Sequence, residues 1–155
     1  MAYRISGIPW IDVAHYLALG DAGLQAAGIE RCFADAQHAY PCRLTLEDAE
    51  PGEELLLLTY WHQPASSPYA AAGPVFIRRN AMDSRVVSNS IPLQQQRRLL
   101  SVRAYGDTHR IVAAEVMPGT DLAAGIEAFF ARGDIAYLHV HNARYGCYAC
   151  RVDRG

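Results

Sequence analysis

The sequence predicts an α+β fold with a mainly antiparallel sheet that can curl into a barrel. Short segments of alternating or continuous apolar residues occupy most of the chain after residue 40, and connections of hairpin length join several of them. A single strong helix pattern comes late, at residues 121–132. Short connections favour antiparallel neighbours, because a parallel pair needs a crossover of a dozen or more residues. The 155 residues fit one domain, 1–155, with a docking segment at 1–40 and a core at 41–155.

The first half of the chain contains a weak helix and two strand candidates. In residues 1–40, apolar residues at helical spacing predict a helical segment that glycines interrupt. Residues 41–46 alternate between apolar and polar types and predict a short strand. Residues 55–60 are apolar on both faces, which is typical of a central strand.

A long loop is expected at residues 61–73, where prolines, serines and a glycine cluster. Loops of this length in a compact domain are often functional, and this one carries His62 and Tyr69. Residues 74–78 then predict a strand, and residues 80–96 predict a second polar connection.

The second half of the chain has the clearest patterns. In residues 97–105, Arg103 and Tyr105 share one face of a predicted strand, and residues 111–117 return as its hairpin partner. The helix at 121–132 has apolar residues at helical spacing, with Thr120 or Asp121 as its expected cap. Two more strands are expected, at 135–141 and 147–152.

Composition excludes several function classes. The formal net charge is −2, which gives no electrostatic footprint for nucleic acid and no basic patch for a membrane surface. Every basic residue is arginine, so chemistry that needs a lysine Schiff base is excluded. No apolar run reaches membrane-spanning length and the first residues do not resemble a signal peptide, so we expect a cytoplasmic protein with reduced cysteines. No nucleotide or zinc-protease motif identifies a cofactor.

The polar residues near the end of the chain are the candidate site. Side chains two apart on a strand lie on one face, so His139 and His141 are expected side by side. They could bind a metal with Cys147 as a third ligand, they could contact a non-metal ligand, or they could be ordinary histidines on a solvated or partly covered strand face. Cys147 and Cys150 lie three apart in an expected strand, which points their sulfurs to opposite faces and argues against a disulfide between them.

Three hypotheses about function follow. The first is a site for a small anionic molecule, either catalytic or purely binding, in which arginine holds the anion and a histidine moves a proton. Its catalytic candidates are His139, His141 and Cys147, and its expected ligand-binding residues are Arg103, Tyr105, Arg144, Tyr145, His62 and Tyr69. The second is an interaction module without chemistry, such as a homodimer. The third is a metal-binding protein that uses His139, His141 and Cys147.

Several short motifs in a fixed order resemble a known family. The chain is similar, from about residue 40 to its end, to the bacterial domain-of-unknown-function family 1203. This resemblance implies a small bacterial domain, and because the family has no assigned function it transfers no catalytic residue. The motifs that carry it are Pro41-Cys42-Arg43, residues 48–53, His62-Gln63-Pro64, Ser67-Pro68-Tyr69, residues 75–78, Arg103-Ala104-Tyr105 and residues 140–148.

Overall fold

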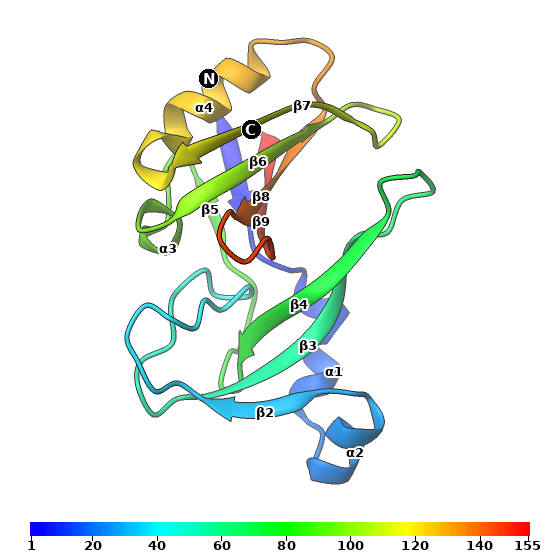
Figure 1. Ribbon diagram of the computed structural model, residues 1–155, viewed down its shortest axis with the longest axis vertical. Coiled ribbons are helices and arrows are strands. Elements are labelled where there is room, and N and C mark those ends of the chain that lie inside the picture. The colour runs from blue at the N-terminus through cyan, green and yellow to red at the C-terminus, as the bar shows by residue number, and fades with distance from the viewer.

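The computed structural model describes residues 1–155 and contains two antiparallel sheets (Figure 1). The larger sheet has six strands in the order β5-β1-β9-β8-β6-β7, and the smaller has three in the order β2-β3-β4. In the larger sheet the strands are β1 (Tyr3–Ser6), β5 (Val86–Ser88), β6 (Leu99–Tyr105), β7 (Ile111–Pro118), β8 (Tyr137–Asn142) and β9 (Tyr148–Arg154). The smaller sheet contains β2 (Glu30–Phe33), β3 (Glu54–Gln63) and β4 (Ala71–Arg78). The helices are α1 (Trp10–Leu17), α2 (Asp21–Ala26), α3 (Leu93–Gln96) and α4 (Leu122–Phe130), and a 3-10 turn at Gly119–Asp121 precedes α4.

Helix α4 covers one face of the larger sheet and closes the main core (Figure 1). Its residues Leu122, Ile126 and Phe130 are buried at helical spacing. They pack in one cluster with alternate residues of the strands, including Leu138 and Val140 of β8. Both faces of β8 are buried, so its other face is covered as well.

The smaller sheet has its own core, formed with α1 and α2. Leu56 and Leu58 of β3 share a buried cluster with Val13 of α1 and Leu24 of α2. Tyr148 of β9 belongs to the same cluster, which joins the smaller sheet to the face of the larger sheet opposite α4. The polar face of β8 therefore lies where the two sheets meet.

The predicted α+β class and the antiparallel pairing are confirmed. The late helix is also found, and the strands expected at 97–105, 111–117 and 135–141 correspond to β6, β7 and β8. The sheet does not close into a barrel, because each of the two sheets keeps free edge strands. Residues 1–40, expected as a docking segment, supply β1 to the larger sheet and β2 to the smaller one.

Three local predictions are wrong. Residues 41–46 form turns with isolated bridges, because the backbone turns back on itself and Leu46 adopts a positive φ of 56°. The expected loop at 61–73 is shorter, since β3 continues to Gln63 and β4 begins at Ala71. Neither Thr120 nor Asp121 caps α4 by a side-chain bond, because the chain enters that helix from the 3-10 turn.

No helix is long and apolar enough to cross a membrane, the longest being α4 with 9 residues.

Gly119 is the tightest glycine position, and replacing it tests the junction between α3 and α4. A Cβ at Gly119 would lie 1.8 Å from the backbone oxygen of Gln95. The Gly119→Ala variant is expected to lose about 1–3 kcal/mol of unfolding free energy, as overpacked core positions do. The matched control is Gly133→Ala, where an added Cβ meets nothing within 4 Å. Urea unfolding of both variants tests this, and equal midpoints would contradict it.

Candidate functional site

Two buried histidines lie side by side on β8. In the sheet register, His139 is paired with Arg103 of β6, and His141 with Ser101. The intervening Val140 points into the core beneath α4. Burial leaves His139 only 2% and His141 only 1% exposed. The predicted pairing of these histidines on one strand face is therefore observed, and the face is covered rather than solvated.

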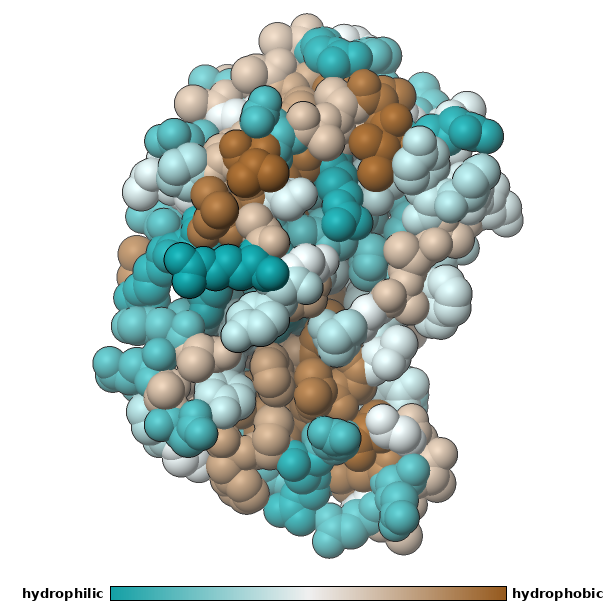
Figure 2. All heavy atoms as spheres, in the orientation of Figure 1, coloured by the Kyte–Doolittle hydropathy of each residue, from teal (hydrophilic) through white to brown (hydrophobic).

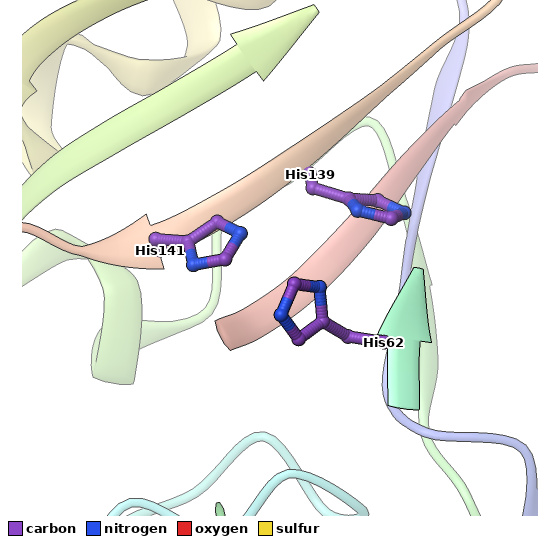
Figure 3. A group of neighbouring side chains, drawn as sticks. All are labelled: His62, His139 and His141. Atoms are coloured by element: carbon purple, nitrogen blue, oxygen red, sulfur yellow. The ribbon is translucent and has the colours of Figure 1, made fainter. Parts of the chain in front are cut away.

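A third histidine reaches this face from the other sheet. Strand β3 has an irregular register with β4 between Tyr60 and Gln63, and His62 lies in that irregular part. The His62 ring stacks on Tyr148, with centroids 5.1 Å apart and planes at 5°. It meets the His141 ring edge-on at 4.9 Å and the His139 ring at 6.0 Å. Figure 3 shows His62 pointing from β3 toward the two histidines of β8.

The three imidazoles bring ligand nitrogens to one place, and we call this group the histidine cluster. One nitrogen from each residue lies within 4.8 Å of the other two. Zinc–nitrogen bonds of about 2.0–2.1 Å place the nitrogens of a tetrahedral site roughly 3.4 Å apart. The rings would have to close by up to roughly 1.5 Å around such an ion. His62 is half-buried, whereas His139 and His141 are buried, so His62 is the least enclosed of the three rings.

Each histidine of the cluster has a buried nitrogen without a hydrogen-bond partner. These atoms are Nδ1 of His62, Nδ1 of His139 and Nε2 of His141. The other nitrogen of His141, Nδ1, lies 3.0 Å from the Gly146 carbonyl oxygen. A carbonyl can only accept, so Nδ1 carries the proton and Nε2 presents its lone pair. This arrangement is the usual support for a metal-binding histidine. Buried polar atoms are rarely left unpaired, so three of them in one cluster point to a missing partner.

Burial keeps all three imidazoles neutral at physiological pH. It lowers the pKa of His62 to about 4, with the charge of Arg103 adding to the effect. Burial also lowers the pKa of His139 to about 2, reinforced by Arg151, and that of His141 to about 3. Neutral imidazole is the form that binds metal ions. Because these groups are unprotonated near pH 7, none of them is poised to act as a general acid there.

Arg103 and a group of tyrosines surround the histidine cluster. The Arg103 guanidinium forms no ion pair with an acidic side chain, whereas Arg151 on the other side of His139 pairs with Asp153 at 2.8 Å. The Tyr105 ring lies 4.9 Å from the His139 ring. The Tyr137 hydroxyl accepts a bond from Gln63 at 2.8 Å. The site thus offers three lone pairs, one guanidinium without an acidic partner and an aromatic wall.

The structure brings together only part of the expected ligand-binding set. His62, Arg103, Tyr105, His139 and His141 lie in or beside the cluster. Tyr69 is 37% exposed in the turn between β3 and β4.

The remaining expected residues lie on the turn between β8 and β9. Arg144 and Tyr145 are exposed there. The Cys147 sulfur accepts a bond from the buried Arg43 at 3.1 Å. Cys147 therefore lies outside the group of possible metal ligands, in which His62 takes the third place.

Comparison with known proteins identifies the family. The family model described as "Protein of unknown function (DUF1203)" matches residues 39–154. The chain belongs to the DUF1203 family. No curated protein and no solved structure matches the chain. The segment of the DUF1203 match includes all three histidines, and it agrees with the motifs that carry the resemblance in the sequence.

Sequence reasoning on this DUF1203 chain missed two things. The apolar strand pattern ends at Tyr60, so it predicts His62 in a loop, as a ligand contact and not as a metal ligand, whereas β3 continues to Gln63. Arg43 stands out in the sequence only as part of the Pro41-Cys42-Arg43 motif, which does not indicate burial, yet its side chain is 1% exposed. A partial signal existed for His62, since Tyr60 and His62 continue the two-residue alternation of Leu56 and Leu58.

Proposed function

We propose that the protein binds a divalent transition metal ion of the zinc class through His62, His139 and His141. The observation that carries this proposal is the convergence of three neutral imidazoles, each with an unpaired buried nitrogen. Imidazole is a preferred ligand for zinc, copper, iron and nickel, and carboxylates that would favour magnesium or calcium are not part of the group. The family match, which assigns no activity, is compatible with this reading.

Three histidine ligands leave one coordination position for a further ligand. Zinc sites with three protein ligands are typical of catalysis, and the fourth position holds water or substrate. Zinc lowers the pKa of bound water to about 7, which supplies hydroxide at neutral pH. Arg103 lies beside His139 in the sheet and has no carboxylate partner. A small oxygen-containing ligand with negative charge would therefore find both a metal and a guanidinium.

An alternative function without metal, in which a histidine moves a proton for an anionic substrate, has less support. It needs at least one histidine that titrates near the working pH. The lowered pKa values of the three histidines leave each of them unprotonated at pH 7 and a weak base. Metal binding uses the same neutral imidazoles without that requirement.

Metal uptake by the purified protein tests the proposal. The protein is treated with a chelator, returned to buffer and titrated with zinc chloride while native mass spectrometry counts bound ions. One zinc per chain is the expected result. Zinc at 100 times its dissociation constant should add about 2.7 kcal/mol of stability, which raises the melting temperature by roughly 5–11 °C. Failure of zinc, cobalt, nickel and copper to bind would overturn the proposal.

A further inference from the structure

A cavity lies apart from the histidine cluster, and none of the three histidines lines it. Its volume is about 830 Å³, within the range of small-molecule sites. The walls come from the segment 38–43, the outer face of β3 and β4, the segment 97–99 and the turn between β8 and β9. In Figure 1 this turn, in dark red, lies close to the cyan segment that precedes β3. We call this cavity the arginine pocket.

The charges around the arginine pocket are strongly one-sided. Arg43, Arg97, Arg98 and Arg144 line it, and no acidic residue does. Behind the wall, Asp48 pairs with Arg98 at 2.8 Å and with Arg97 at 3.7 Å, so one carboxylate serves two guanidinium groups. Arg43 and Arg144 form no ion pair. The pocket is therefore positive although the whole chain has a formal net charge of −2, and such a site concentrates anions.

Arg43 is the most informative of these residues. Its side chain is 1% exposed, yet none of its three hydrogen-bond acceptors is a carboxylate. Nε donates to the Tyr148 carbonyl at 2.8 Å, Nη1 to the Pro41 carbonyl at 2.5 Å and Nη2 to the Cys147 sulfur at 3.1 Å. Buried charges are normally paired, because desolvation without a counter-charge is costly. An anion in the pocket would supply the missing negative charge.

The remaining wall of the arginine pocket is apolar and partly aromatic. Leu57, Pro74 and Phe76 present the outer face of the smaller sheet, and the Tyr40 ring packs against Phe76 with centroids 5.2 Å apart. In Figure 2 hydrophobic atoms gather over the middle of β3 and β4, with strongly hydrophilic atoms next to them. A ligand that fills such a space needs a flat apolar body as well as a charged end.

We infer that the arginine pocket binds a small organic anion with a flat apolar body and a carboxylate or phosphate head. The head lies among the guanidinium groups, where arginine can form paired hydrogen bonds with two oxygens. The body lies on Tyr40, Phe76 and Leu57. This site is separate from the histidine cluster and does not depend on metal.

Paired probes test the inference with the full chain. Protein freed of metal with a chelator is titrated calorimetrically with 1-naphthyl phosphate and, separately, with uncharged 1-naphthol. The phosphate is expected to bind one per chain and at least tenfold more tightly than the alcohol. Arg144→Gln should weaken phosphate binding at least fivefold, because it removes one of the positive charges that line the pocket. Arg144 is exposed, so the substitution should leave the fold intact. Arg110→Gln, an exposed arginine outside the pocket, is the matched control and should bind like wild type.

The cysteines give a second readout that locates the probe. Cys147 lines the pocket, whereas Cys32 lies on β2 outside it, and neither is fully buried. Saturating 1-naphthyl phosphate should slow alkylation of Cys147 by iodoacetamide at least fivefold and leave Cys32 unchanged, as followed by peptide mass spectrometry. His139→Gln should keep the phosphate affinity, which separates this site from the proposed metal centre. Equal binding of both probes, no binding, or unchanged affinity in Arg144→Gln would overturn the inference.

Discussion

The His139→Gln variant is expected to lose zinc binding. His139 is one of three ligands, and its imidazole is held by the sheet register opposite Arg103. Glutamine is close in size but supplies no imidazole lone pair. Removing a residue that only supports a metal ligand lowers metal affinity roughly 10–100-fold. Removing a ligand itself should therefore lower the zinc affinity by more than about 100-fold. Calorimetric titration of the chelator-treated variant with zinc chloride measures this, and His62→Gln and His141→Gln should behave alike.

Two controls make this result specific. His15 on α1 is exposed and is not part of the histidine cluster, so His15→Gln should keep the wild-type zinc affinity. Cys147→Ser should keep it too, because the Cys147 sulfur is bonded to Arg43 and is not part of the ligand group. A large loss in Cys147→Ser together with full binding in His62→Gln would instead support the ligand set His139, His141 and Cys147 expected from sequence.

When no metal is bound, the unfolding free energy of the protein is expected to fall steeply as the pH is lowered. In the unfolded chain a histidine has a pKa near 6.5, whereas burial lowers the folded value of His139 to about 2 and that of His141 to about 3. Between these values the unfolded state binds more protons than the folded state, so the unfolding free energy rises with pH. The contribution of the two neutral histidines to the unfolding free energy is fully present above about pH 6.5 and is lost as the pH falls. Each buried histidine contributes a slope of up to about 1.4 kcal/mol per pH unit.

Urea unfolding at several pH values between 7.5 and 5.5 measures this slope. In that range few carboxylates titrate, so the histidines dominate. The double variant His139→Gln/His141→Gln should have a much flatter profile, while His15→Gln should follow wild type. A wild-type profile as flat as that of the double variant would mean that the two histidines accept protons in the folded state.

The sequence was most informative where a pattern is local. The face of β8 that carries His139 and His141 follows from two-residue periodicity alone, and the core packing of Leu138 and Val140 agrees with it. Helix α4 follows in the same way from apolar residues at helical spacing. These elements depend on neighbours a few residues apart, which a sequence displays directly.

The composition of the site depends on contacts that a sequence does not display. His62 and His141 are far apart in the chain and meet only because the smaller sheet packs on the polar face of the larger one. The direction of Cys147 depends on the turn before β9, in which Gly146 has a φ of +78° and the pairing of β8 with β9 shifts register. A one-residue shift in a strand pairing changes which face a side chain occupies. That is why Cys147 meets Arg43 in place of the histidines.

Crystals soaked in zinc chloride, with diffraction data collected on both sides of the zinc absorption edge, test the metal centre most directly. The account predicts one anomalous difference peak per chain, about 2.0–2.1 Å from a nitrogen of each of His62, His139 and His141. It also predicts that His141 keeps its bond from Nδ1 to the Gly146 carbonyl and binds the ion through Nε2. A peak at Cys147 or on surface residues, with the three histidines unligated, would contradict the account.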